Sequence, residues 1–422
     1  MSGLFRSFRH KNYRLFYSGQ IISLTGNWLQ STVLGWLVYS LTKSSAMLGV
    51  VGFTTMAPTL VFGVVAGVFA DRWNKQKALI GTQFIAMILA LALALLTITG
   101  LVQIWHILVI GLAAGIAGTF DMPLRQAFLV EMVGPRDLSN AIALNSIMFN
   151  VARIIGPALA GVLVGLIGEG YCFLLNTITY SFVIYALFMI RTERPVYVAA
   201  GEPVLLSLKQ GLSYAWENPF IRNPLLLLFG TSLVMMPVMT LMPVAAAEML
   251  KGGPKTLGTL VASVGAGAFI AGVHLAGRGS PRGMASIIAS SSVIYGAGLI
   301  LFSISRNVLP ASLMLVCAGI GLMRQNVGTN TLLQTLVPNE FRGRIMSLYV
   351  MTFMGLAPLG SLFFGWLASI IGISWTLTIA GVWVLVSAVW FINHIEEMKK
   401  SVRHMAEGHP DPGIAQWMNT VV

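Results

Sequence analysis

A short charged stretch, GVFADRWNKQK (67–77), stands between two long apolar runs. Its first glycine, Gly67, follows Gly63 at the four-residue spacing that lets helix backbones approach closely. The Asp71 carboxylate can accept hydrogen bonds from the exposed N–H groups at another helix's N-terminus, where negative charge is favoured. The stretch therefore predicts a polar contact between close helices. The alternative is a solvated loop carboxylate beside basic residues that set membrane topology.

A second charged group centres on Asp121 and Arg125, which stand four residues apart and so share a helical face, although Pro123 lies between them. We expect Asp121 to pair either with Arg125 or with Arg72. Arg324 occupies the position that corresponds to Asp121 in the sequence repeat described below. We therefore hypothesise that Asp121 and Arg324 meet when the cytoplasmic side closes; two separately solvated charges are the alternative.

Arg153 lies inside a long apolar run, where an embedded arginine costs about 3 kcal/mol and is a functional-site hypothesis by default. Gly156, Pro157 and Gly161 follow it closely. These small residues have an alternative role in plain helix packing.

A polar stripe at helical spacing runs along the first apolar segment, for which lipid is a poor neighbour. Its members are Gln20, Ser23, Asn27 and Gln30. Near the middle of the chain, Met235, Met236 and Met239 offer flexible thioethers that suit an adaptable apolar wall, or ordinary packing.

The elements that must position these residues are membrane helices. Of 422 residues, 56% are hydrophobic and only 9% are charged, too few to cover a water-facing surface. At about 20 residues for each crossing, the apolar runs predict about twelve spans and an all-α integral membrane fold. The spans are read at 14–40, 45–70, 78–99, 103–123, 139–167, 171–190, 223–249, 257–276, 284–305, 308–334, 344–371 and 374–394.

The formal charge of +12 follows the loops. With the N-terminus inside, only Lys43, Lys251, Lys255 and Arg306 fall in outer loops, and the inner loops hold the other basic residues outside the spans, among them Arg6 and Arg9. This positive-inside bias predicts that both termini are cytoplasmic. Topology and contact with the lipid bilayer explain the charge, so we expect no nucleic-acid partner.

The longest polar interruption divides the chain near its middle, and an amphipathic pattern within it predicts a linker helix resting on the membrane. The segment LVEMVGPRDL (129–138) aligns with LLQTLVPNEF (332–341), which indicates duplicated halves with a site at their interface. The predicted parts are an N-terminal six-helix bundle (1–191), a cytoplasmic linker (192–222), a C-terminal six-helix bundle (223–395) and a cytoplasmic tail (396–422).

Enzyme motifs are missing from the sequence: it has no GxxxxGK[ST] phosphate loop, HExxH or GxSxG pattern. We therefore expect no enzyme, no cofactor and no metal site. Without a phosphate loop, ATP is not the chain's own power source, which leaves an ion gradient or the substrate's own gradient.

The 67–77 stretch resembles the loop signature GxxxDRxGRRR of the major facilitator superfamily, with Asn74 in place of a glycine and Gln76 in place of a basic residue. The resemblance extends over most of the chain to its transmembrane secretion effector branch, which includes the enterobactin exporter and macrolide efflux proteins. The segments that carry it are GNWLQ (26–30), LTKSS (41–45), Pro123 with Gln126 and Ala127, ALNS (143–146), ARIIGPALAG (152–161) and LKQGLSYAWENP (208–219).

This resemblance implies a major facilitator fold of two pseudo-symmetric six-helix bundles. It implies a cytoplasmic gate made of Gly67, Asp71, Arg72, Lys75, Lys77, Asp121 and Arg125. Arg153, Gly156, Pro157 and Gly161 resemble part of the antiporter motif GxxxGPxxGG. A central cavity would be lined by Gln20, Asn27, Gln30, Met235, Met239 and Arg324.

The function expected from it is proton-coupled efflux of an amphiphilic small molecule, of the drug, macrolide or siderophore class. The protein would work as a monomer in a bacterial inner membrane, by alternating access. The alternatives are an importer or lipid flippase of the same fold and a non-transporting receptor or scaffold. A membrane enzyme would need a catalytic cluster that the sequence lacks.

Overall fold

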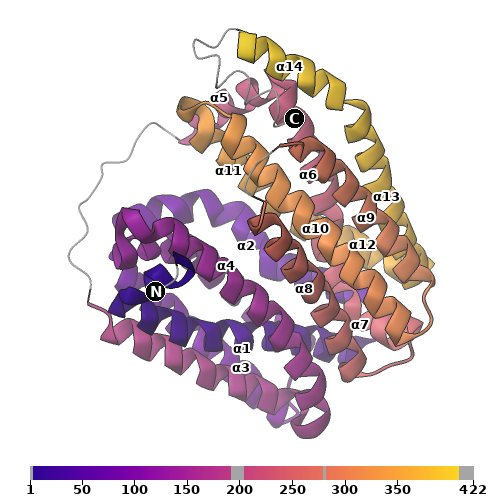
Figure 1. Ribbon diagram of the computed structural model, residues 1–422. Helices are drawn as coiled ribbons and strands as arrows, with labels where there is room; N and C mark the ends of the chain where they lie inside the picture. The colour runs from indigo at the N-terminus through magenta and orange to yellow at the C-terminus, as the bar shows by residue number, and fades with distance from the viewer. Residues whose placement is uncertain (1–2, 192–203, 279–281, 408–422) are drawn as a thin grey trace. The chain divides into compact units, whose positions relative to one another are not determined.

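The computed structural model describes residues 3–191, 204–278 and 282–407. Every regular element in these ranges is helical, as predicted (Figure 1). The chain divides into two compact units, Met1–Gly201 with Met242–Ala262, and Glu202–Leu241 with Ser263–Val422.

The first unit is built on four long helices, preceded by the short helix η1 (Gly3–Arg9). They are α1 (Lys11–Thr42), α2 (Ser45–Arg72), α3 (Lys75–Ile98) and α4 (Ile104–Met189). α4 packs against each of the other three, and it contacts α1 and α3 most extensively. Two short pieces, α7 (Met242–Val244) and η2 (Ala245–Met249), complete the unit together with the start of α8 (Pro254–Ala276).

α4 is three helical segments rather than one rod. Gly134 and Gly168 interrupt it with φ of 69° and 81°, a left-handed conformation that favours glycine because it has no Cβ. The first segment continues past residue 123, where the sequence predicted the span to end, as far as the kink at Gly134.

The second unit begins with the linker helix α5 (Val204–Glu217). Its long helices are α6 (Pro219–Thr240), α9 (Met284–Ile304), α10 (Val308–Leu336), α11 (Asn339–Gly355), α12 (Ala357–Ile371) and α13 (Ile373–Asn393), and α14 (Ile395–Glu407) follows them. α9 packs between α10 and α13, while α6 contacts α12 and α13.

Nine helices within the described ranges are long and apolar enough to cross a membrane, counting α4 once. α1 is not among them because polar side chains such as Asn27 and Gln30 lower its hydropathy. The all-α membrane architecture is thus confirmed, and the count of twelve spans stays a prediction.

Candidate functional site

The loop between α2 and α3 turns at Trp73 and Asn74. The Asn74 side chain caps α3 by accepting a hydrogen bond from the Lys77 backbone N–H at 3.0 Å. Asparagine thus has a local function at the position where the resembling family has glycine. The Asp71 side chain lies outside the described residues. Within its own unit, no described atom would come within 4 Å of a Cβ built on Gly67, so its predicted close helix approach stays a prediction.

Gln76 ties the start of α3 to the end of α4. Its Nε2 donates to the carbonyl oxygens of Leu187 at 2.6 Å and Ile190 at 2.8 Å. The last carbonyls of a helix have no partner within the helix, and this side chain supplies one. Asn12 donates in the same way to the carbonyl oxygen of Arg191 at 2.8 Å.

The basic residues of the predicted gate have different environments. Lys75 Nζ lies 2.9 Å from Oε1 of Glu131 on α4, and the two side chains are only 13% and 15% exposed. Arg72 and Lys77 are exposed. Lys75 therefore belongs to the packing between α3 and α4, whereas Arg72 and Lys77 face outward.

Asp121 is buried in the first segment of α4 and is fully engaged there. Its Oδ2 pairs with Arg125, one of the two partners that the sequence left open. Its Oδ1 accepts hydrogen bonds from Thr82 Oγ1 at 2.9 Å and Gln83 Nε2 at 2.6 Å, both on α3. Because the helix runs on to Gly134, a rise of about 1.5 Å per residue places Asp121 roughly 20 Å from that kink.

The polar stripe of α1 meets an amide on the last segment of α4. Asn176 Nδ2 donates to Gln30 Oε1 at 2.7 Å and, more weakly, to Asn27 Oδ1 at 3.3 Å. Thr179 Oγ1 donates to Asn176 Oδ1 at 2.8 Å. Gln20 is buried on the same helix, and its Nε2 has no partner among the described residues. The sequence analysis missed Asn176, although an asparagine within a long apolar run was a visible signal.

Gly156, Pro157 and Gly161 lie where the second segment of α4 touches other helices of the first unit. A Cβ on Gly156 would lie 2.7 Å from the Thr25 carbonyl oxygen of α1. Gly161 lies against the start of α8, where a Cβ on Gly258 would meet the Pro157 carbonyl oxygen at 2.5 Å. These residues therefore allow close backbone contact on two sides.

Arg153 lies one turn before this contact. Its Nη2 donates to Asn150 Oδ1 at 2.8 Å, and its Nε is buried without a partner among the described residues. Asn150 was not predicted; it is buried and also donates to the Ser146 carbonyl oxygen.

The second unit holds the remaining cavity candidates. Met235 on α6 is buried and accepts a long contact of 3.8 Å from Asn326 Nδ2, and Met239 is half-buried. Arg324 on α10 is half-buried, and its Nε has no partner among the described residues. The neighbouring Gln325 donates to Thr231 Oγ1 at 2.7 Å.

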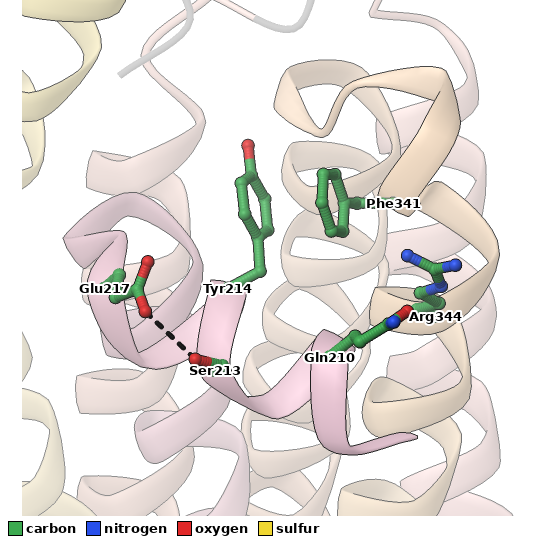
Figure 2. Close-up of a pocket in the computed structure, with 6 residues that line it drawn as sticks. All are labelled: Gln210, Ser213, Tyr214, Glu217, Phe341 and Arg344. Carbon is green, nitrogen blue, oxygen red and sulfur yellow. Dashed lines mark hydrogen bonds between the residues drawn. The ribbon is translucent and has the colours of Figure 1, made fainter. Parts of the chain in front are cut away.

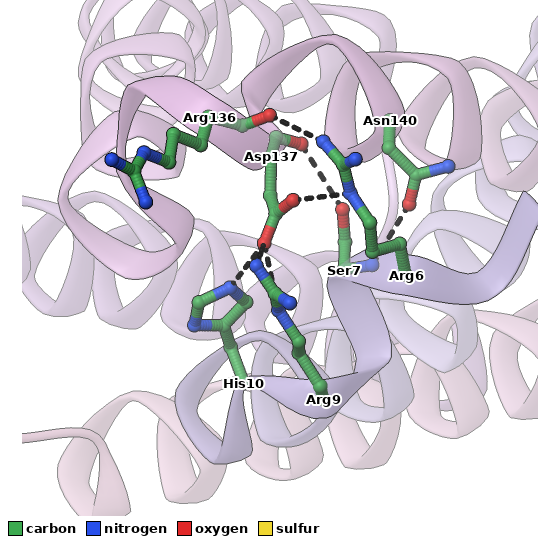
Figure 3. A network of polar contacts seen from close by, with 7 residues as sticks. All are labelled: Arg6, Ser7, Arg9, His10, Arg136, Asp137 and Asn140. Carbon is green, nitrogen blue, oxygen red and sulfur yellow. Dashed lines mark hydrogen bonds and ion pairs between the residues drawn. The ribbon is translucent and has the colours of Figure 1, made fainter. Parts of the chain in front are cut away.

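The N-terminal residues form a clamp on the turn after Gly134, which the sequence analysis missed (Figure 3). The Asp137 carboxylate, with 1% of its side chain exposed, pairs with Arg6 at 2.5 Å, Arg9 at 2.6 Å and His10 at 2.7 Å. Ser7 adds hydrogen bonds to the Asp137 carbonyl oxygen and to Asn140 Oδ1. Arg6 and Arg9 were predicted only as topology signals, since nothing nearby in the sequence points to Asp137.

The linker helix α5 packs on α11 in the second unit and borders an open pocket of about 420 Å³ (Figure 2). The rings of Tyr214 and Phe341 stack with centroids 4.0 Å apart, and the Arg344 guanidinium lies over Phe341. Burial raises the pKa of the Tyr214 hydroxyl, and the negative charge of Glu340 raises it further. Leu212 and Trp216 are exposed on the helix, whereas Ala215 is buried in the core of the second unit, so the membrane-resting role of this helix stays a prediction.

The sequence matches the family described as transmembrane secretion effector over residues 2–420. It is 27% identical to the staphyloferrin A transporter of Staphylococcus aureus, over 92% of this chain and 97% of that protein. It is 25% identical to macrolide efflux protein A of Streptococcus pyogenes, over 92% of this chain and 99% of that protein.

The fold resembles that of a bacterial homologue of the human lysosomal transporter Spinster, solved in an inward-facing, unoccupied conformation. The TM-score is 0.72 at 13% identity, and the match covers 93% of this chain and 98% of the other. At this identity the likeness shows the fold alone.

Proposed function

Because this chain belongs to the transmembrane secretion effector family of major facilitator transporters, we propose that it exports an amphiphilic small molecule across a bacterial plasma membrane, driven by the proton gradient. It is a multi-pass membrane transporter, which the family match and the helices establish. Relatives named as a macrolide efflux protein and a siderophore transporter support a small-molecule cargo.

The observation that carries the proposal is the amide cluster of Asn27, Gln30 and Asn176 inside the membrane helices of the first unit. Polar side chains inside a membrane are expensive and mark substrate or ion pathways. This cluster, with Gln20 about two turns away on α1, would supply donors and acceptors for the polar part of a substrate. Met235 and Met239 of the second unit would supply a flexible apolar wall.

Asp121 is our candidate for the proton carrier. It is a buried carboxylate held by donors from α3 and by Arg125. Protonation would remove its charge, weaken its bond to Arg125 and release that guanidinium. Such a change of partners at a packed helix pair is the kind of local event that biases a two-state transporter.

In the proposed cycle, the two halves rock about the substrate so that the cavity opens alternately to each side. Asp71, Arg72 and Lys77 would form the cytoplasmic latch, with both termini on that side. An importer, a lipid flippase and a non-transporting receptor are the alternatives, and the direction of flux separates them.

The test is retention of a chemically diverse compound panel in exporter-deficient cells that express the protein. We expect at least one compound to be retained less with the native protein. A protonophore, Asp71→Asn and Asp121→Asn should each restore its retention. Lys251→Gln, in a predicted outer loop, is the matched control and should leave export unchanged.

Two results would count against the proposal. If the protein is present in the membrane and the retention of every compound is unchanged, the proposal that it exports a small molecule is wrong. If export continues in the presence of the protonophore and in the Asp121→Asn variant, proton coupling through the Asp121 carboxylate is ruled out.

A further inference from the structure

Tyr180, on the last segment of α4, is buried close to two polar groups of the first unit. The first is the amide cluster, since the Tyr180 hydroxyl is in hydrogen-bond contact with the side chains of Asn27 and Asn176. The second is the ion pair of Asp121 and Arg125, whose charges both act on this hydroxyl. One neutral side chain therefore lies within reach of the candidate substrate contacts and of the candidate proton carrier.

Helical spacing explains this position. Tyr180 comes four residues after Asn176, so the two side chains share a face of the last segment of α4. That face meets α1, because Asn176 Nδ2 donates to Gln30 Oε1 and, more weakly, to Asn27 Oδ1. A buried tyrosine hydroxyl usually finds a hydrogen-bond partner, and α1 and α4 supply amides for it here.

The network around Asp121 has room for one more donor. Its carboxylate accepts hydrogen bonds from Thr82 and Gln83 and pairs with Arg125, whereas a carboxylate offers about four acceptor positions. Gln83 Oε1, beside this network, is buried and has no partner among the described residues. A tyrosine hydroxyl suits such a place because it can both donate and accept and stays neutral at ordinary pH.

Few charged groups act at this place in the described part of the first unit. Arg125 contacts Asp121, and these two charges are the ones that act on Tyr180. The contacts from α3 and α1 come from uncharged hydroxyl and amide groups. A hydrogen bond gained or lost by the Asp121 carboxylate should therefore change its proton affinity measurably.

Resting on the proposed transport function, we propose that Tyr180 is a positioning residue that couples substrate binding at the amide cluster to proton binding at Asp121. In the empty site, its hydroxyl stays with the amides. When a polar group of the substrate engages Asn27 and Asn176, the hydroxyl turns and donates to the Asp121 carboxylate.

This change of partners opposes protonation of Asp121, because a hydrogen bond to the charged form of an acid favours that form. A protonated Asp121 then releases its proton to water on the side to which the site is open, while Tyr180 keeps its own proton. Since such coupling is reciprocal, proton binding at Asp121 in turn weakens substrate binding. Substrate and proton would thus exchange for one another.

The first test needs no substrate, because removing an amide frees the hydroxyl as substrate binding would. Infrared difference spectroscopy of the purified full chain follows the carboxyl stretch of protonated Asp121, which Asp121→Asn lacks. We expect Asn176→Ala to weaken proton binding at Asp121 about tenfold, a shift of about one pH unit. In a Tyr180→Phe background, Asn176→Ala should cause no shift. Asn27→Ala repeats the test from α1 if Asn176→Ala does not fold.

Tyr185→Phe is the matched control. Tyr185 is exposed on the same segment of α4, so loss of its hydroxyl should leave the shift caused by Asn176→Ala intact. A purely structural role for Tyr180 would lower the thermal stability of Tyr180→Phe and leave the Asn176→Ala shift as large as in the native background.

The second test uses the first compound of the retention panel that the native protein exports. At the pH where Asp121 is half-protonated, this compound should release protons from the native protein, measured in weakly buffered solution. Its affinity should be about tenfold lower when Asp121 is protonated, as reciprocity requires. Tyr180→Phe should still bind the compound and release no protons.

Equal infrared shifts in the native and Tyr180→Phe backgrounds overturn the inference, as does the absence of a shift in both. Proton release by Tyr180→Phe equal to that of the native protein overturns it too. If Asp121 shows no protonated band at any pH at which the protein stays folded, both this coupling and the carrier role of Asp121 are wrong. If compounds are exported without the infrared shifts, the export proposal survives alone. If the shifts appear and nothing is exported, the transport proposal fails instead.

Discussion

The side-chain amide of Gln76 donates a hydrogen bond of 2.6 Å to the carbonyl oxygen of Leu187, which lies 111 residues further along the chain. A second bond reaches Ile190, so one side chain satisfies two carbonyls at the end of α4. The first turn of α3 thus holds the end of the last segment of α4 in place.

Replacing Gln76 by alanine should lower stability, because the carbonyls lose their donor. An unsatisfied buried group costs about 1–3 kcal/mol, so the apparent melting temperature should fall by several degrees. Gln76→Lys should stay close to the native value, since lysine can also bond the last carbonyls of a helix. Thermal unfolding of the purified protein measures both. Equal melting temperatures for the alanine variant and the native protein would contradict the cap.

Lys75 and Glu131 should be energetically coupled. Because both side chains are mostly buried, removing either one leaves the other charge poorly solvated. We expect Lys75→Met and Glu131→Gln each to destabilise the protein, and the double variant to lose less than the two losses together. A double-mutant cycle on thermal stability should give a coupling of about 0.5–3 kcal/mol. Additive losses would show that the pair contributes nothing.

Gly156 should not tolerate a methyl group. A Cβ at this position would lie 2.7 Å from the Thr25 carbonyl oxygen, so α1 and α4 would have to separate. Overpacking of this kind costs about 1–3 kcal/mol, and export should fall with it. Gly165→Ala is the control, because a Cβ there has no described atom within 4 Å. The prediction fails if both alanine variants behave alike.

Asp137→Asn should release the N-terminal segment from α4. The substitution removes the charge that Arg6, Arg9 and His10 share. Backbone amides around Ser7 should then exchange hydrogen at least tenfold faster by mass spectrometry, while amides in the middle of α3, which are hydrogen-bonded within the helix, stay protected. Asn140→Ala should have a smaller effect, since it removes the hydrogen bond from the Ser7 backbone N–H and no charge. Unchanged exchange around Ser7 in the Asp137 variant would rule out the clamp.

The membrane architecture could be predicted because apolar run length and loop charge act locally. The length of the first segment of α4 could not be predicted. The sequence ended that span at residue 123, since charged residues follow it, yet Arg125 and Glu131 are neutralised by Asp121 and Lys75 and the helix continues. The Lys75–Glu131 pair joins residues far apart in sequence, and nothing near either residue in the sequence points to it.

The candidate site divides in the same way. Asn27 and Gln30 could be found because helical spacing places them on one face. The contacts of Asn176 with these residues and the Asp137 clamp depend on which helices pack together, and this cannot be read from a single sequence. The two interruptions of α4, at Gly134 and Gly168, fall between the predicted spans 103–123, 139–167 and 171–190, although the sequence did not single out either glycine.

The clamp also constrains how the protein is made. Arg9 and Asp137 are separated by 128 residues, which a ribosome takes roughly 6–26 s to add at about 5–20 residues per second. Until then the cluster of positive charge at the N-terminus has no acidic partner in the clamp and remains available to anionic headgroups. Membrane insertion of the first helix therefore precedes its anchoring, and the final attachment of the N-terminus waits for synthesis of the fifth predicted span to begin.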